Sequence, residues 1–249
     1  MERKEPLRCF LDYTLITDET GQKNSHLSHQ LAVGAEAGLG RLGGLGAQVW
    51  LDWCDVEHTA DGVRGHDLQE ADYRAYWRPP VEAAGVFLEI GWIAETFPNR
   101  TGDAAYTNEW YVSVGLDDSK WFGTESGVLN PYLAYYMDMD NYRGSWMEFG
   151  LSHSFFLARM GLAKTPILQH VSLTPSFLVG IDHRQVTRST RVGTIQYGID
   201  IRLDLSDLLK IPPKYGYLGL TGFLYFRDSL LEPHIEDRLY GGVSLTFTQ

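Results

Sequence analysis

The C-terminal stretch 239–247 alternates between two kinds of side chain along its length. Apart from Gly241, its odd-numbered residues are apolar: Leu239, Val243, Leu245 and Phe247. The residues between them are small or polar. Successive side chains of a β-strand point to opposite faces, so a period of two indicates a strand. Because an unpaired edge strand invites aggregation, we expect this strand to pair with the first strand of the chain and close a barrel.

The same alternation recurs throughout the chain. It covers residues 8–16, 27–39, 45–53, 71–77, 86–94, 110–116, 133–139, 147–157, 171–182, 195–203 and 218–226. No amphipathic helix and no domain boundary stand out. The sequence therefore predicts an all-β protein, in which residues 1–249 form a single antiparallel up-and-down barrel of about 12 strands.

Glycine and proline mark several connections between these segments. The glycines in 41–44 predict a tight turn, and Pro79 and Pro80 end the preceding strand because proline donates no hydrogen bond. The polar stretch 55–67 reads as a loop, and 206–215 as a turn that contains one helical turn. Pro175 lies inside a strand pattern, which predicts a β-bulge there.

Charge and hydropathy exclude some classes of protein. The formal net charge of −11 disfavours binding to nucleic acid, whose phosphates require a basic surface. No apolar run approaches the ~20 residues of a transmembrane helix. The first six residues are charged and Asp12 interrupts any apolar core after them, so we do not expect a signal peptide in this stretch.

The composition of the two strand faces indicates which of them meets lipid. The apolar faces carry no Asp, Glu, Lys or Arg, as a lipid-facing surface requires. The opposite face is rich in Gly, Ser, Thr and Ala, which suit a crowded interior. Aromatic residues near strand ends fit an interfacial girdle: Trp53, Trp77, Trp110 and Phe247. We therefore expect a transmembrane barrel; the alternative is a soluble β-barrel that binds a small apolar ligand.

Short motifs add a resemblance to a known family. The spacing Tyr240-x-Gly242-x-x-Leu245-x-Phe247, the run 129–136 and the run 148–155 resemble those of small porins, the β-barrels of Gram-negative outer membranes. The resemblance implies a bacterial outer-membrane location and assembly by the barrel-assembly machinery through Tyr240, Gly242, Leu245 and Phe247. It transfers no catalytic residues. One departure is that Thr248 and Gln249 follow the final aromatic residue.

The predicted inward face is acidic. It carries the carboxylates Asp12, Glu36, Asp52, Glu70, Asp72, Glu89, Glu95, Glu109, Asp138, Asp140, Glu148, Asp182, Asp200 and Asp204. It also carries the cations Arg8, Arg74, Arg78, Arg202 and Arg227. Charge of one sign between low-dielectric walls favours counter-ions. We expect a narrow, weakly cation-preferring channel for small solutes; the alternative is an interior closed by paired acids and arginines.

Enzymatic readings find less support. His26 and Ser28 share one strand face, as a Ser–His lipid hydrolase of the membrane-barrel kind requires, but no third partner is evident. Asp138 and Asp140 could act as paired carboxylates, and the histidines in 58–66 match no strong metal-ligand spacing. We therefore expect no catalytic residues, metal site or cofactor, and keep a structural or lipid-modifying outer-membrane barrel as a further alternative.

Overall fold

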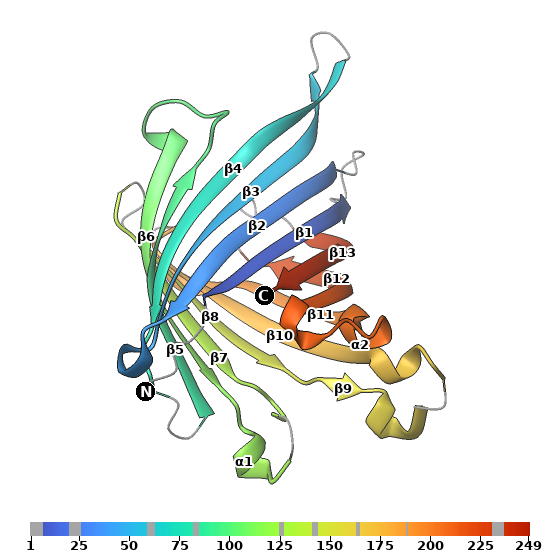
Figure 1. Ribbon diagram of the computed structural model, residues 1–249. Helices are drawn as coiled ribbons and strands as arrows, with labels where there is room; N and C mark the ends of the chain where they lie inside the picture. The colour runs from blue at the N-terminus through green and yellow to red at the C-terminus, as the bar shows by residue number, and fades with distance from the viewer. Residues whose placement is uncertain are drawn as a thin grey trace.

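The computed structural model describes residues 7–19, 26–58, 63–81, 85–124, 127–140, 144–162, 165–187, 189–230 and 237–249. Within them, one antiparallel sheet closes on itself to form a barrel of 12 strands (Figure 1). The strands are β1 (Arg8–Glu19), β2 (His26–Gly38), β3 (Gly44–His58), β4 (Val63–Arg78), β5 (Val86–Thr96), β6 (Tyr106–Leu116), β7 (Tyr132–Asp138), β8 (Ser145–Ser152), β10 (Val171–His183), β11 (Thr190–Asp204), β12 (Tyr217–Ser229) and β13 (Arg238–Thr248). The two-residue strand β9 (Phe155–Phe156) pairs only with β10. The predicted all-β up-and-down barrel is confirmed.

Short helical turns lie in the connections. They are η1 (Gly40–Leu42), η3 (Gly102–Ala105), α1 (Ser119–Phe122), η4 (Ala158–Leu162), η5 (Leu168–His170), α2 (Leu205–Leu208) and η6 (Pro213–Tyr215). The helical turn expected in 206–215 corresponds to α2. The tight turn expected in 41–44 is also present, with Gly43 at φ +84° and too close to the carbonyl of Arg78 for any side chain. No helix in the described part of the chain is long and apolar enough to cross a bilayer.

The first and last strands form the seam of the barrel. Leu11 lies opposite Phe247 and Tyr13 lies opposite Leu245, so the predicted closure is confirmed. The two residues after Phe247 extend the seam, since the backbone groups of Cys9 and Gln249 exchange hydrogen bonds of 2.7 and 2.8 Å. The C-terminal residues therefore complete the pairing with β1.

The two ends of the barrel differ. At the terminal end, defined by Arg8, Arg78, Asp204 and Thr248, the long connections with α1, η4 and α2 emerge. The opposite end, the hairpin end, is defined by Glu19, His58, Thr96 and Ser229. There β3 and β4 pair as far as His58 and Val63, and Figure 1 shows this hairpin rising past the neighbouring strands.

The hairpin corrects the expectation of a loop over 55–67. Only 59–62 fall between the two strands, and these lie outside the described residues. A search for alternating apolar residues misses such polar strands, because backbone hydrogen bonds alone hold them together beyond the apolar part of the wall. The register shifts where this extension begins, between Asp52 and Trp53.

A second correction concerns β8 and β10. The expected strand 147–157 is interrupted after Ser152 and resumes as β9. Pro175 lies at this interruption, where the pairing of β10 with β8 ends at Ser176 and Ser152, so its missing N–H breaks no bond to β8. Its carbonyl accepts the N–H of His153 (3.2 Å). The bulge predicted at Pro175 is wrong; the register shift in β10 lies at Gly180/Ile181.

The outward face of the wall is apolar and exposed. Its exposed residues include Leu11, Tyr13, Val33, Leu45, Val49, Tyr73, Trp77, Trp110, Val112, Leu133, Tyr135, Met147, Phe149, Phe177, Tyr197, Ile201, Leu224, Val243 and Leu245. We call this surface the apolar belt. A water-soluble protein rarely exposes so large a continuous apolar surface. The polar strand faces point instead into the barrel.

Candidate functional site

The interior wall alternates glycine with tyrosine. A Cβ on Gly46 would collide with the ring of Tyr76, and one on Gly91 would collide with the ring of Tyr111. Both rings are buried. Glycine on one strand therefore makes room for a tyrosine on the next, which explains the small residues of the inward face. Sequence reasoning missed these tyrosines as interior residues, although their strand parity places them there.

An arginine–carboxylate network lines the terminal half of one wall. Glu89 on β5 is buried and accepts hydrogen bonds from Arg74, from Arg78 (2.7 Å) and from the hydroxyl of Tyr111 (2.7 Å). Arg78 also forms an ion pair with Glu36 on β2. Arg74 stacks on Tyr111, with its guanidinium carbon 4.6 Å from the ring centroid. These charges mostly neutralise one another.

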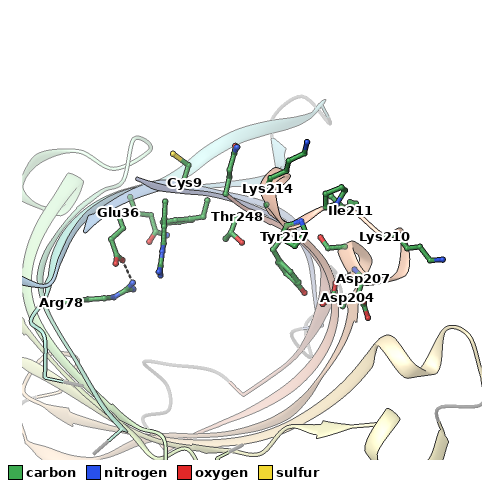
Figure 2. Close-up of a pocket in the computed structure, with 18 of the residues that line it drawn as sticks. Cys9, Glu36, Arg78, Asp204, Asp207, Lys210, Ile211, Lys214, Tyr217 and Thr248 are labelled. Carbon is green, nitrogen blue, oxygen red and sulfur yellow. Dashed lines mark hydrogen bonds and ion pairs between the residues drawn. The ribbon is translucent and has the colours of Figure 1, made fainter. Parts of the chain in front are cut away.

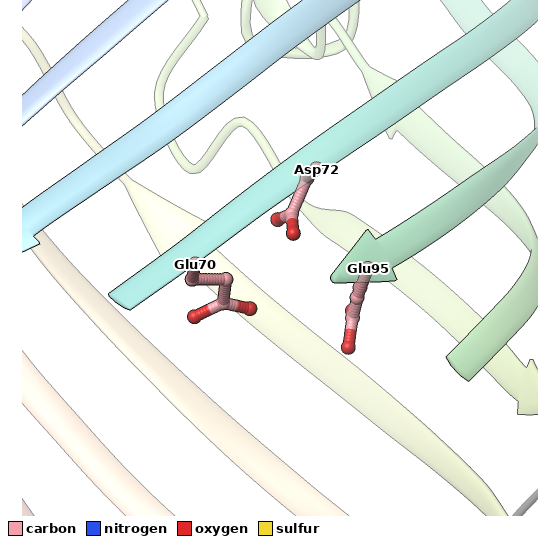
Figure 3. A group of neighbouring side chains, drawn as sticks. All are labelled: Glu70, Asp72 and Glu95. Carbon is pink, nitrogen blue, oxygen red and sulfur yellow. The ribbon is translucent and has the colours of Figure 1, made fainter. Parts of the chain in front are cut away.

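A second group of carboxylates lies at the hairpin end of the same wall. Glu70, Asp72 and Glu95 offer oxygen atoms that all lie within 4.8 Å of one another (Figure 3). Among the described residues no salt bridge reaches any of the three, and Oδ1 of Asp72 is buried without a hydrogen-bond partner. Arg100, in the connection beyond β5, acts on Glu70 electrostatically. Carboxylates held this close create a strongly negative local potential.

Two neighbouring acids are tied into the wall. Glu109 accepts the amide of Gln185 (2.7 Å), and Asp138 accepts the hydroxyl of Thr107 (2.7 Å). Asp138 also accepts the backbone N–H of Asp140 at 2.9 Å. Both Glu109 and Asp138 are buried. These bonds explain how the wall tolerates further carboxylates beside Glu95.

The other predicted acids hold local structure. Asp12 accepts the hydroxyls of Thr14 (2.8 Å) and Ser244 (2.7 Å), which crosses the seam. Asp182 is fully buried and accepts the backbone N–H groups of three residues, Gln185, Val186 and Thr187, at 2.8–2.9 Å. Four further acids accept hydrogen bonds: Asp200 from Tyr225, Glu148 from Trp146, Asp52 from Ser28 and Asp204 from the N–H of Asp207. Two predicted arginines donate hydrogen bonds: Arg202 to Tyr217 and Arg227 to Gln196.

Charge is unevenly divided along the barrel. The terminal half carries Arg8, Arg74, Arg78 and Arg202 together with Asp12, Glu36, Glu89, Asp200 and Asp204. Of the predicted lumen charges, the hairpin half carries Asp52, Glu70, Asp72, Glu95, Glu109, Asp138, Asp140, Glu148 and Asp182 against Arg227; Arg191 and Arg238 also lie at this end, opposite Asp182 and Arg227 in the strand ladders. The sequence could not show this division, because it follows from which end of each strand a residue occupies.

A cavity of about 1190 Å³ opens at the terminal end. Residues from opposite walls line it, including Arg78 and Glu36 on one side and Asp204 and Tyr217 on the other (Figure 2). An adjoining cavity of about 670 Å³ shares Arg8, Glu36 and Arg78 with it. Figure 2 shows the ion pair between Arg78 and Glu36 on one side of this cavity.

The candidate catalytic groups do not come together in the described part of the chain. Ser28 donates its hydroxyl to Asp52, and His29, on the opposite face, contacts the hydroxyl of Tyr13 at 2.7 Å. The side chain of His26 and the stretch 58–66 that holds the remaining candidate histidines lie outside the described side chains. Asp140 is exposed beside Asn108, whereas Asp138 is buried.

Comparison with known proteins identifies the fold. No family model and no curated protein matches the sequence. The KdgM porin aligns at 9% identity over 96% of this chain and 98% of its own, with a TM-score of 0.50. The beta domain of a Bordetella autotransporter aligns at 11% identity over 98% and 99%, with a TM-score of 0.50. Outer membrane phospholipase A from Escherichia coli has 13% identity, coverages of 96% and 89%, and a TM-score of 0.49. At such identities the likeness concerns architecture alone: the chain has the fold of outer-membrane β-barrels.

Proposed function

We propose that this chain is a channel of the bacterial outer membrane that passes small solutes and prefers cations to anions. The observation that carries the proposal is the sorting of side chains across the wall. An uncharged apolar belt faces outward, and carboxylates that form no salt bridge among the described residues face the interior. Lipid requires the first arrangement, and an aqueous pore explains the second.

The cation preference rests on the hairpin half. A solute entering there meets Glu70, Asp72 and Glu95 before it reaches the arginines of the terminal half. Low-dielectric walls focus the field of such acids and concentrate cations. The proposed pore-lining set is Asp12, Glu36, Asp52, Glu70, Asp72, Arg74, Arg78, Glu89, Glu95, Glu109, Asp138, Asp140, Glu148, Asp200, Arg202 and Asp204. Asp182, which the sequence also predicts to line the pore, is fully buried and holds the turn at 185–187 instead.

The proposal excludes a catalytic role and includes an assembly partner. Ser28 donates its hydroxyl to Asp52, and the side chain of His26 lies outside the described side chains. We further propose that residues 1–249 insert as one barrel domain. The barrel-assembly machinery would recognise Tyr240, Gly242, Leu245 and Phe247 on the seam strand β13.

Neutralising the acidic group tests the cation preference. In the triple variant Glu70→Gln, Asp72→Asn, Glu95→Gln we expect the cation-to-anion permeability ratio to fall roughly fivefold, because the focused field is lost. The ratio follows from the reversal potential of single channels in a planar bilayer under a KCl gradient. The matched control is Asp12→Asn, an acid on β1, three strands from β4, that is held by Thr14 and Ser244. An unchanged ratio in the triple variant would refute the assignment.

The axial division of charge predicts rectification. At low salt we expect roughly twofold more current when the voltage drives cations from the hairpin end toward the terminal end. Cations then flow out of the acidic half, and anions, which move the opposite way, are repelled where that half begins. Both kinds of ion therefore accumulate inside the pore and carry the larger current. In 1 M KCl the Debye length falls to ~3 Å and the current should become symmetric. Current–voltage curves at both salt concentrations measure this; symmetric curves at low salt contradict it.

A further inference from the structure

The connection between β8 and β10, residues 153–170, has an unusual composition for this chain. It contains no Asp or Glu, although the protein as a whole has a net charge of −11. It carries Arg159 and Lys164 among many apolar residues. A connection in water between two strands is normally polar, so these residues have no evident role in an aqueous loop.

The described part of this connection exposes apolar side chains, with Phe155 and Phe156 on opposite faces of β9. Phe155, Phe156, Met160 and Ile167 are exposed, with Met160 at 59%. The segment is nevertheless fixed, because Leu157 is buried and its N–H bonds to the carbonyl of Val171 (3.1 Å). Figure 1 shows β9 and the turn that follows projecting away from the barrel wall. The exposed apolar surface is thus held in place.

This surface continues the apolar belt. Phe155 pairs with Leu173 on β10, and the exposed Phe177 lies farther along the same outward face. The neighbouring connection with α1 exposes Trp121, at 69%, and Phe122. On the other side, Nδ1 of His170 lies 2.7 Å from Asp207 in α2, which joins a third connection with exposed Leu209 and Tyr215. Apolar side chains therefore extend along part of the rim at the terminal end.

Cations accompany these side chains. The guanidinium of Arg159 lies over the ring of Phe156, 4.9 Å from its centroid. Lys210 beside Leu209 and Lys214 beside Tyr215, whose ring centroid lies 4.8 Å from Nζ, follow the same pattern. The connection with α1 does not, because Asp117 and Asp118 lie close to Lys120 and Trp121 in the sequence. Aromatic and aliphatic side chains interleaved with Lys and Arg are typical of segments that lie in the interface of anionic membranes.

We propose that Phe155, Arg159, Met160 and Ile167 form an interfacial shelf that lies in the headgroup region of an anionic phospholipid leaflet. The inference rests on the proposed membrane location and names a lipid contact that a barrel wall alone does not need. Continuity with the apolar belt places lipid beside the shelf. The cations, with no acid in 153–170, select anionic headgroups over neutral ones.

Accessibility of a label at Met160 tests the shelf. The full chain carries Cys9→Ser, Cys54→Ser and Met160→Cys, labelled with a small fluorophore and reconstituted into phosphatidylcholine vesicles with or without phosphatidylglycerol. In a matched protein the label sits at Val186→Cys, an exposed position in the connection at the hairpin end. With anionic lipid we expect acrylamide to quench the label at Met160 about fivefold less than the label at Val186. A label in the bilayer is shielded from acrylamide, and one cation near an anionic surface favours the membrane-bound position by about fivefold. Arg159→Glu should remove the protection and Arg159→Lys should keep it.

Insertion of the barrel is checked separately by its heat-modifiable mobility in gels and by channel conductance. Absence of both overturns the proposed membrane location along with the shelf. An inserted, conducting barrel whose label at Met160 is quenched as strongly as that at Val186 overturns the shelf alone. Protection that depends on the protein-to-lipid ratio also overturns it, since a second barrel would then cover the surface.

Discussion

A barrel with Val243→Arg is expected to lose about 2–4 kcal/mol of stability in the bilayer, whereas Ser244→Arg should leave it folded. Val243 lies in the middle of β13 on the apolar belt, so the new guanidinium would face hydrocarbon. Ser244 faces the interior and bonds to Asp12, where an arginine gains a carboxylate partner. Urea unfolding from lipid vesicles, followed by the heat-modifiable gel shift, measures both variants.

The two residues are adjacent and receive the same substitution, so the comparison isolates the face of the strand. A soluble barrel with the same backbone gives the opposite order, because an exposed valine in water tolerates arginine and an interior serine does not. A stable Val243→Arg protein with a destabilised Ser244→Arg protein would therefore contradict the membrane assignment of the apolar belt.

Glu89→Ala is expected to cost about 3 kcal/mol, the largest effect we expect from a single interior side chain. The substitution removes one buried carboxylate and leaves Arg74 and the Tyr111 hydroxyl without their acceptor, while Arg78 keeps only Glu36. Unpaired charges in a narrow wall retain only part of their hydration. Equilibrium unfolding in detergent micelles measures the loss.

Glu36→Ala is the matched control for this prediction. Glu36 accepts from Arg78 and Tyr76, and the side chain of Arg78 is half exposed and keeps Glu89 as a partner. We expect a loss of about 1 kcal/mol or less for Glu36→Ala. Equal stabilities for the two variants would show that the network around Glu89 does not stabilise the wall.

Much of the fold could be predicted from alternation alone. A strict period of two specifies a strand and the two faces of that strand. The C-terminal strand needed another strand to pair with, and β1 supplies it at the seam. The polar extension of β3 and β4 could not be predicted, because side-chain pattern vanishes where a hairpin leaves the lipid-facing zone. The break after Ser152 was also hidden, since Phe155 continues the apolar period across it.

The sequence predicts which residues face the interior, but it does not predict which of them contact one another. Parity alone placed Glu89 and Arg74 on the same side of the wall. Their ion pair depends on the register between β4 and β5, which no single-strand pattern contains. The approach of Glu70, Asp72 and Glu95 depends on the same register. The division of charge between the two ends follows from strand direction, which becomes known only with the topology.

In the proposed channel, apolar residues face lipid, and carboxylates that form no salt bridge among the described residues favour cations inside the pore. The most direct test of this proposal is the zero-current potential of the wild-type protein in a planar bilayer between concentrated and dilute KCl. We predict discrete conductance steps and a potential that is positive on the dilute side, because K⁺ crosses more readily than Cl⁻. A bilayer that stays silent, or a potential of the opposite sign, would contradict the account.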